Sequence, residues 1–299
     1  MKNFAIIGVA GYVAPRHLQA IRDTGNTLVA AIDKSDSVGI LDSYFPHADF
    51  FTEFERFDRH LEKLRRDGKR TDYVTICSPN YLHDAHIRFA LRQHADAICE
   101  KPLVLNPWNL DALSSIEKES GRKVFTILQL RLHPAIVNLK RQVESAPKDK
   151  HFKIDLRYIT SRGNWYHHSW KGDISKSGGV ITNIGIHLFD MLLWVFGGVK
   201  QMELEKSEQD HASGKFELER ATVEWFLSIN PEHLPVAVKA SGKRTFRSFQ
   251  IENSEVEFSD GFADLHTVCY KNILEGKGFG IEDARPSIET ACKLRSIKK

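Results

Sequence analysis

Apolar and polar positions follow different periods in the two halves of the chain. In the first half, short apolar runs of the kind that form buried parallel strands cover 4–8, 27–32, 73–77, 95–99 and 124–128. Segments with apolar residues at helical spacing separate these runs and predict helices ending near 23, over 53–66, ending near 93 and over 106–120. Alternating strands and helices predict an α/β fold for residues 1–128, a doubly wound parallel sheet with right-handed crossovers.

In the second half, the period shortens to two. A helix with Ile136, Leu139 and Val143 on one face comes first, and alternating residues then predict a strand over 152–158. We expect further strands over 200–206, 216–229, 236–240 and 244–252, the last two joined by a turn at 241–243. This pattern predicts an α+β domain over residues 129–299, with an open-faced, mostly antiparallel sheet.

One face of that second sheet is expected to carry no helices. Trp225, Phe226 and Phe249 lie in its predicted strands, so this face is a candidate interface for a homo-oligomer, either a dimer or a tetramer. A position in the hydrophobic core explains the same three aromatic residues equally well.

Composition and charge narrow the possible partners. The chain has 299 residues, a formal net charge of +3 and four cysteines. So small a charge gives no reason to expect nucleic acid or a membrane surface as a partner. The apolar run at 4–10 is too short for a membrane span and lacks the features of a signal peptide. The cysteines show neither metal-ligand nor disulfide spacing, so we expect a reduced, cytoplasmic protein without a bound metal.

Small residues connect the first predicted strand to the first helix. Gly8, Gly11 and Ala14 are spaced three apart, which leaves room for a pyrophosphate at the helix N-terminus. Asp33 ends the second strand, where a carboxylate accepts hydrogen bonds from the adenosine ribose and repels a 2′-phosphate, favouring NAD over NADP. A simple helix cap is the alternative role for Asp33. The candidate cofactor-binding residues here are Gly8, Ala10, Gly11, Tyr12, Val13 and Asp33.

A charged pair and a proline follow the strand over 95–99. Glu100 and Lys101 are of types rarely buried without partners, and Pro102 has no N–H with which to extend a sheet. Because the carboxyl ends of parallel strands meet at one edge of a sheet, we expect Lys101 beside Gly8 and Ser78, at the rim of a dinucleotide site. A strand-end turn with two solvated charges is the alternative.

A loop rich in aromatic and cationic residues covers 162–172. Functional residues concentrate on loops that a rigid scaffold holds. Arginine suits a phosphate or a carboxylate, and tryptophan suits a flat ring. The candidates for binding the anionic groups of a substrate are Arg131, Arg162, Asn164 and Lys171. A surface loop without a function is the alternative.

Two glycines, Gly178 and Gly179, lead into a helix that is predicted to end near 196. Its buried stripe comprises Ile184, Leu188, Met191, Leu192 and Val195, and a second stripe comprises Asn183, His187, Asp190 and Trp194. We expect this second stripe to be an active-site face, on which Asp190 holds the His187 imidazole in one tautomer. A merely solvated face is the alternative.

Taken together, these motifs resemble those of the Gfo/Idh/MocA oxidoreductases. The matching segments occur in the family's order between about residues 4 and 196: the glycine turn, 78–80 with His83, 100–102, 129–134, and 178–179 through His187 and Asp190. The resemblance implies a Rossmann domain followed by an open-faced antiparallel sheet, with Lys101 and His187 as the catalytic residues. It also implies that NAD contacts Ser78, Asn80, His83, Glu100, Lys101, Gln129 and Trp170.

The chain departs from the family at Asn183, where the family usually has Asp. An amide cannot take up a proton, so Asn183 can orient a hydroxyl but cannot act as the base. This Asn, the lengthened glycine turn and the aromatic loop resemble one subgroup, the NAD-dependent UDP-N-acetyl-2-amino-2-deoxyglucuronate dehydrogenases. These enzymes oxidise the sugar 3-hydroxyl to a ketone in bacterial surface-polysaccharide (O-antigen, lipopolysaccharide) biosynthesis.

The resemblance therefore implies NAD-dependent oxidation of a sugar nucleotide. His187 is the expected proton acceptor, and Lys101 is expected to stabilise the developing alkoxide, with the exchanged roles as the alternative. Candidate substrate contacts are Lys101, Arg131, Arg162, Asn164, Lys171, Asn183 and His187. Two other functions stay open: a dehydrogenase for a free sugar or an inositol, and a catalytically silent NAD-binding sensor.

Overall fold

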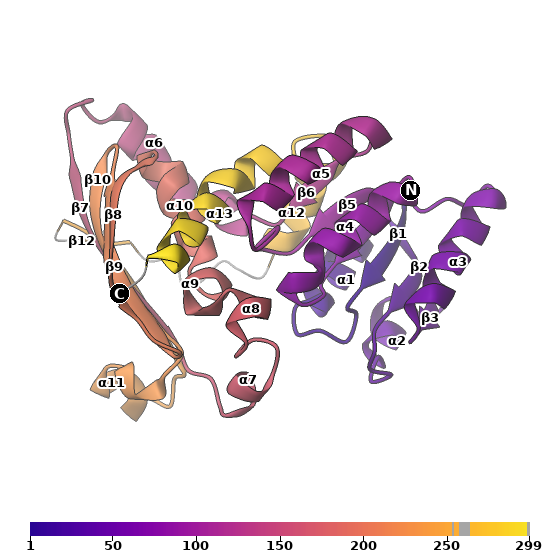
Figure 1. The fold of residues 1–299 in the computed structure, drawn as a ribbon, viewed down its shortest axis with the longest axis horizontal. Helices are drawn as coiled ribbons and strands as arrows, with labels where there is room; N and C mark the ends of the chain where they lie inside the picture. The colour runs from indigo at the N-terminus through magenta and orange to yellow at the C-terminus, as the bar shows by residue number, and fades with distance from the viewer. Residues whose placement is uncertain (253, 257–263, 298–299) are drawn as a thin grey trace. The chain divides into compact units, whose positions relative to one another are not determined.

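Two compact units make up the chain, as Figure 1 shows with its elements labelled. A computed structural model describes residues 1–252, 254–256 and 264–297. The first unit comprises Met1–Gln129 and Asp264–Arg285, and the second comprises Leu130–Ala263 and Pro286–Lys299.

The sheet of the first unit has six strands, all parallel, in the order β3-β2-β1-β4-β5-β6. The strands are β1 (Asn3–Ile7), β2 (Thr27–Ile32), β3 (Asp49–Phe51), β4 (Tyr73–Ile76), β5 (Asp96–Cys99) and β6 (Val124–Thr126). The predicted doubly wound α/β sheet is confirmed. The sequence pattern did not predict β3, because three residues are too few to show a period.

Helices follow the strands of this sheet in turn. They are α1 (Ala14–Asp23), α2 (Ile40–Tyr44), α3 (Phe54–Arg66), α4 (His83–Arg92) and α5 (Pro107–Ser120), with short 3-10 helices η1 (Asn80–Leu82) and η2 (Gln129–Leu132). Their apolar faces are fully buried at Leu18, Phe57 and Leu110. Each helix therefore contributes one apolar stripe to the core, as its spacing predicts.

A segment near the end of the chain also belongs to the first unit. It contains α12 (Leu265–Leu274) and the start of α13 (Ile281–Ser296). Tyr270 stacks on Phe4 with ring centroids 5.8 Å apart, and the Thr126 amide donates to the Phe279 carbonyl at 2.9 Å. We expected one continuous second domain over 129–299. The difference arises because a helix's sequence shows its apolar face but not the sheet on which that face packs.

The sheet of the second unit also has six strands, in the order β12-β11-β7-β10-β9-β8. They are β7 (Phe152–Thr160), β8 (Val199–Ser207), β9 (His211–Leu218), β10 (Ala221–Ser228), β11 (Thr245–Ile251) and β12 (Ser254–Glu255). Among the described strand pairings of this second sheet, only that of β7 with β10 is parallel. The predicted mostly antiparallel sheet is therefore confirmed.

Two of the predicted strands in this unit were wrong. Residues 216–229 contain the end of β9 and the whole of β10, with a bend at 219–220 between the two strands. Residues 236–240 form a short helix, α11 (Val236–Ala240), directly after Pro235. Their mostly apolar composition does not reflect burial, since Val236 is 85% exposed. The predicted hairpin at 241–243 is accordingly absent.

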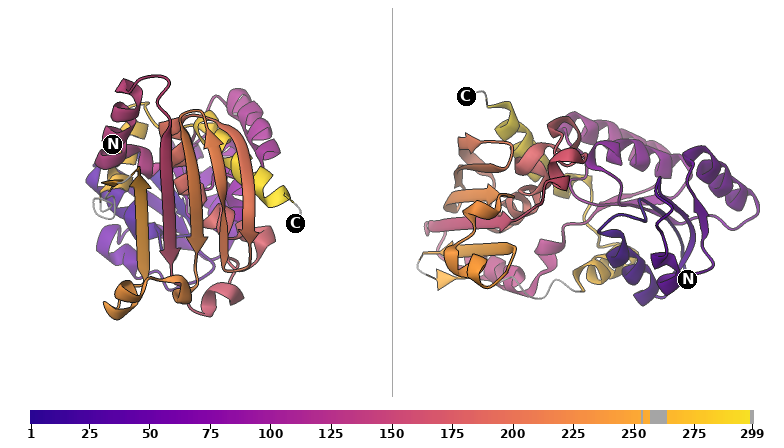
Figure 2. Two further views of the ribbon diagram at one scale, coloured as in Figure 1. Left: turned by 90° about the vertical axis from the view of Figure 1, so that its left-hand side faces the viewer. Right: turned by 90° about the horizontal axis from the view of Figure 1, so that it is seen from below.

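Helices lie on one face of this second sheet, and Figure 2 (left) looks onto the other face. The helices of the unit are α6 (Pro134–Ser145), α7 (Trp165–His168), α8 (Ile174–Ser177), α9 (Gly179–Asn183), α10 (Ile186–Phe196) and α11, with the 3-10 helix η3 (Pro231–His233). Trp225 and Phe249 are buried in the core, whereas Phe226 is half-buried. Of the three aromatics proposed for the free face, Trp225 and Phe249 are therefore core residues.

Within the described residues, no single helix combines the length and apolar character of a membrane span. Two consecutive helical segments, Ile174–Asn183 and Ile186–Phe196, have this length and apolar character only when they are taken together, and the chain bends by 45° between them.

A glycine in β9 tests the packing of this second sheet. A Cβ atom on Gly214 would lie 2.1 Å from the Glu203 carbonyl oxygen and 2.7 Å from the Trp225 ring. Gly214→Ala should therefore lower the free energy of unfolding by about 1–3 kcal/mol in urea titrations. The control is Gly39→Ala, because a Cβ atom on Gly39 meets nothing within 4 Å. Equal stability of the two variants would contradict the packing described.

Candidate functional site

The glycine turn of the first unit brings three backbone segments together. Gly8 has φ of +88°, and a Cβ atom there would lie 2.8 Å from the Cys77 carbonyl group. Only glycine fits this position without displacing the chain after β4. The following helix, α1, has no side-chain N-cap, but the Ala14 and Arg16 amides already donate to the Gly11 and Val13 carbonyl oxygens, and Pro15 has no N–H. Tyr12 is 91% exposed beside them.

Asp33 lies directly after β2 and contacts the glycine turn. Its Oδ2 accepts a hydrogen bond from the Ala10 amide, and its Oδ1 accepts one from the Ser35 amide, both at 3.0 Å. The carboxylate thus closes the turn and also caps the residues that follow it. Both roles considered for Asp33 from the sequence are compatible with this geometry.

Two histidines surround the strand end at Ser78. The buried His83 ring lies 2.7 Å from the Pro102 carbonyl and 2.9 Å from the Ser78 carbonyl, so it joins two of the predicted motifs. The Ser78 hydroxyl hydrogen-bonds with His86 Nδ1 at 2.8 Å. Burial lowers the pKa of His83, and it lowers the pKa of His86 to about 4. The His86 ring is therefore neutral at physiological pH.

Glu100 is buried, contrary to the alternative of two solvated charges. Its Oε1 lies 2.9 Å from His17 Nε2 and 3.0 Å from His266 Nε2, and its Oε2 accepts the Lys101 amide at 3.2 Å. Burial by itself raises the pKa of Glu100, but the hydrogen bonds from the two histidines outweigh it and hold that pKa well below its ordinary range. The sequence predicted Glu100 but neither histidine, since nothing in their local pattern marks them.

Two other predicted cofactor residues of this unit are buried as well. Asn80 is 5% exposed in η1, and Gln129 is 8% exposed at the start of η2. The side-chain oxygen of Gln129 makes no hydrogen bond among the described residues. A buried acceptor without a donor costs free energy, so this oxygen is suited to a ligand N–H or O–H group.

In the second unit, the predicted active-site helix is broken in two. The chain turns at Gly185, between α9 and α10, and a Cβ atom there would lie 2.5 Å from the Ile181 carbonyl oxygen. Asn183 therefore ends one helix and His187 lies in the first turn of the next, both half-buried. The four polar residues assigned to one helical stripe do not share one helix, because the break was not visible in the apolar spacing.

Asn183 hydrogen-bonds with the hydroxyl group of Tyr166, and its role in orienting a substrate hydroxyl stays a prediction. Its amide nitrogen donates to the Tyr166 hydroxyl oxygen at 2.7 Å, and Tyr166 is 2% exposed. Burial raises the pKa of Tyr166 above its ordinary value. The phenol is therefore neutral and retains its own proton as a donor.

Asp190 forms an ion pair that the sequence did not predict. Arg131 Nε donates to Asp190 Oδ2 at 2.9 Å and Arg131 Nη2 donates to Oδ1 at 2.8 Å, with both residues buried. Both oxygens of Asp190 accept from this guanidinium, and the expected contact of Asp190 with His187 stays a prediction. The expected contact of Arg131 with the substrate also stays a prediction.

The aromatic loop around α7 places a cation between two rings. Lys171 Nζ lies 4.3 Å from the centre of the Trp170 ring and 5.7 Å from that of Trp165. Burial lowers the pKa of Lys171, and the nearby Arg162 acts in the same direction. Trp170 thus contacts Lys171 in this loop, while Arg162 and Asn164 are exposed.

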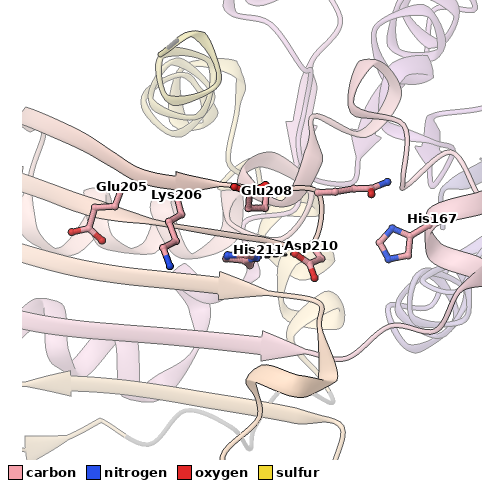
Figure 3. Close-up of a pocket in the computed structure, with 7 residues that line it drawn as sticks. His167, Glu205, Lys206, Glu208, Asp210 and His211 are labelled. Atoms are coloured by element: carbon pink, nitrogen blue, oxygen red, sulfur yellow. Dashed lines mark hydrogen bonds and ion pairs between the residues drawn. The ribbon is translucent and has the colours of Figure 1, made fainter. Parts of the chain in front are cut away.

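A polar cavity of about 820 Å³ lies beside this loop in the second unit. Figure 3 shows His167 of α7 on one side of it and residues of the β8–β9 hairpin on the other. The hairpin contributes Glu205, Lys206, Glu208, Gln209, Asp210 and His211. Three carboxylates against one lysine disfavour a diphosphate, so we do not assign this cavity to a sugar nucleotide.

Comparison with protein families identifies the class of the chain. A model of the oxidoreductase family with an NAD-binding Rossmann fold matches residues 2–128, and a model of that family's C-terminal alpha/beta domain matches residues 150–228. The chain belongs to the Gfo/Idh/MocA oxidoreductase family, which confirms the resemblance seen in its motifs. Its first unit accordingly contains the family's NAD-binding domain.

Two crystal structures of the WlbA (WbpB) dehydrogenase from Thermus thermophilus are similar to the whole chain. The first, in complex with NAD and alpha-ketoglutarate, has 48% sequence identity and a TM-score of 0.96. The second, in complex with NAD and UDP-GlcNAcA, has 47% identity and the same TM-score. Each similarity covers 100% of this chain and 96% of the Thermus chain.

A more distant curated relative is the glucose-6-phosphate 3-dehydrogenase of Bacillus subtilis. It is 22% identical over 205 residues, which are 66% of this chain and 54% of that protein. The chain therefore matches about half the length of this relative.

The buried His86 predicts how stability depends on pH. Its pKa is about 4 in the folded state, against about 6.5 in an unfolded chain. Between these values the unfolded state binds more protons, so the free energy of unfolding should fall as pH falls from 7 to 5. His86→Gln should reduce that fall in urea titrations at both pH values. His47→Gln, which changes an exposed histidine, is the control, and an unchanged pH dependence in His86→Gln would contradict the assignment.

Proposed function

We propose that the chain oxidises the sugar 3-hydroxyl of a UDP-N-acetylaminosugar uronate (UDP-GlcNAcA) to a 3-keto sugar, with NAD as the hydride acceptor. The observation that carries this proposal is the 47% identity, over the whole chain, to a Thermus dehydrogenase in complex with NAD and UDP-GlcNAcA. The residues of the predicted motifs supply the groups that such a reaction needs.

The reaction requires that a proton leave the hydroxyl as hydride leaves the carbon. We assign His187 as the proton acceptor and Lys101 as the cation that stabilises the developing alkoxide, with the exchanged roles as the alternative. Asn183 cannot take the proton, but its hydrogen bond to Tyr166 supports an orienting role. The geometry of the Asn183–Tyr166 pair thus fits a site in which a carboxylate is not needed as the base.

Residues of the aromatic loop are suited to the anionic groups of this substrate. Arg162 and Asn164 are exposed, and Lys171 is held against two indole rings. A UDP-uronate carries a diphosphate and a carboxylate, which guanidinium and ammonium groups bind through charge-assisted hydrogen bonds. We assign Arg162, Asn164, Lys171 and Arg131 to these groups.

We infer a cytoplasmic setting in surface-polysaccharide (O-antigen) biosynthesis. All four cysteines are free, and Cys99 and Cys269 are buried, as in a reducing compartment. We further propose a homo-oligomer formed through the helix-free face of the second sheet. Half-buried Phe226 and Phe246 line a cavity of about 490 Å³ on that face, and such surfaces are typical of subunit interfaces.

Turnover of UDP-sugars tests the proposed reaction. The purified protein with NAD should produce NADH, followed by its absorbance, from UDP-GlcNAcA faster than from free sugars or inositols. Lys101→Met and His187→Asn should each lower kcat by roughly 10²–10⁴, while the affinity for NADH stays nearly unchanged. Absence of turnover with every UDP-sugar would favour a sensor, and loss of NADH binding in both variants would assign the two residues to the fold.

Cofactor preference tests the role of Asp33. The chain should bind NADH at least tenfold more tightly than NADPH, a difference of about 1.4 kcal/mol, because the carboxylate repels a 2′-phosphate. Asp33→Asn should narrow the difference by removing the charge while an amide oxygen still accepts hydrogen bonds. Asp33→Ser should narrow it as well. Equal affinities of the unaltered chain for the two cofactors in titration calorimetry would show that Asp33 does not face the ribose.

A further inference from the structure

The Glu100 carboxylate lies at the centre of a buried hydrogen-bonded chain within the first unit. His17 comes from α1, His266 and Tyr270 come from α12, and Thr75 comes from β4. Besides the two contacts with Glu100, His17 Nδ1 lies 2.9 Å from the Tyr270 hydroxyl, which lies 2.8 Å from the Thr75 hydroxyl. The side chains of His17, His266 and Tyr270 are at most 2% exposed.

The direction of each hydrogen bond follows from the chemistry of the groups. An ionised carboxylate can only accept, so both histidines donate to Glu100 through Nε2–H. A neutral imidazole has one donor, so His17 Nδ1 accepts the hydrogen bond that Tyr270 donates. The Tyr270 oxygen then accepts from Thr75. With a neutral His17 imidazole, the chain from Thr75 to Glu100 is therefore complete and holds one buried negative charge.

The charges around this site agree with that assignment. Burial lowers the pKa of His17, which keeps its ring neutral, and burial raises the pKa of Tyr270, which keeps its proton on the hydroxyl. The titratable groups that face Glu100 from the surrounding elements are His17, Cys77, His83, Cys99, Lys101, His266, Cys269 and Tyr270.

The carboxylate also holds the backbone of its neighbour. Glu100 Oε2 accepts the hydrogen bond of the Lys101 amide, at the turn from which the Lys101 side chain leaves the sheet. His266 and Tyr270 lie outside both segments that the family models match. Neither model therefore assigns them a role.

We propose that His17, His266 and Tyr270 are positioning residues, which hold the Glu100 carboxylate and, through it, the turn that carries Lys101. The proposal rests on the proposed function in one respect, namely that Lys101 acts on the substrate. Without these donors the carboxylate would be buried and underbonded, a state that favours its protonation.

Paired variants separate hydrogen bonding from packing. Tyr270→Phe removes one hydroxyl and keeps the ring that stacks on Phe4. Tyr73→Phe is the matched control, because Tyr73 also stacks on Phe4, at 4.9 Å, and lies outside the hydrogen-bonded chain. His17→Leu removes both contacts of the ring, whereas His17→Gln retains a donor for Glu100 and an acceptor for Tyr270.

Steady-state kinetics with UDP-GlcNAcA give the first readout. His17→Leu should lower kcat by about tenfold or more, the loss expected for one hydrogen bond to a charged group, with a smaller change in KM. His17→Gln should recover most of that loss, Tyr270→Phe should give a partial loss, and Tyr73→Phe should give none. The acidic limb of the kcat profile should move to higher pH in His17→Leu, because losing a donor raises the pKa of the carboxylate.

Several results would overturn the proposal. They are equal losses of kcat in His17→Leu and His17→Gln, equal kcat in Tyr270→Phe and Tyr73→Phe, and an acidic limb of the kcat profile that does not move in His17→Leu.

Histidine side-chain 15N spectra give a readout that needs no substrate. They should show the neutral Nε2–H tautomer for the His17 ring between pH 6 and 8, and an imidazolium or an Nδ1–H tautomer of that ring would contradict the network. A stoichiometric metal ion bound by His17, Glu100 and His266 in the purified protein would also contradict the network, because the metal would take the place of both N–H donors.

Failure of the proposed function would be seen separately. If the unaltered chain oxidised no UDP-sugar, the same variants would be compared by their affinity for NADH, measured by its fluorescence. Weakened binding in His17→Leu and restored binding in His17→Gln would still support the positioning role. Identical affinities in the two variants would overturn it.

Discussion

The first unit depends on the burial of one negative charge. Taking a carboxylate out of water costs several kcal/mol unless hydrogen bonds replace its hydration. Two imidazole N–H groups and one backbone amide do this for Glu100. Because these donors come from α1, from α12 and from the turn after β5, the buried charge ties these three elements together.

Local patterns were sufficient to predict most of the fold. Buried parallel strands appear as short apolar runs, and the helices between them have apolar stripes, so the doubly wound sheet followed from spacing alone. The errors occurred where the apolar pattern of the sequence does not match the burial of the residues in the structure. Residues 236–240 are mostly apolar, like a buried strand, but form a helical turn after Pro235 that is largely exposed, and β3 is too short to show a period.

The candidate site was predictable wherever it depends on chain direction. Glycine turns and strand ends meet at one edge of a parallel sheet, so Gly8, Asp33, Ser78 and Glu100 could be grouped from their order alone. The partners of these residues were not predictable. His266 is 166 residues away from Glu100, and Asp190 is 59 residues away from Arg131, and no local spacing encodes such pairings.

The return of α12 to the first unit also affects how the chain is made. A ribosome releases the strands of the NAD-binding sheet early, but His266 and Tyr270 emerge only after almost all of the second unit has been synthesised. Until then Glu100 lacks one of its two imidazole donors, and the ring of Phe4 lacks Tyr270 as a stacking partner. The first domain to be translated is thus among the last to be completed, and its nascent form depends on the far end of the same chain.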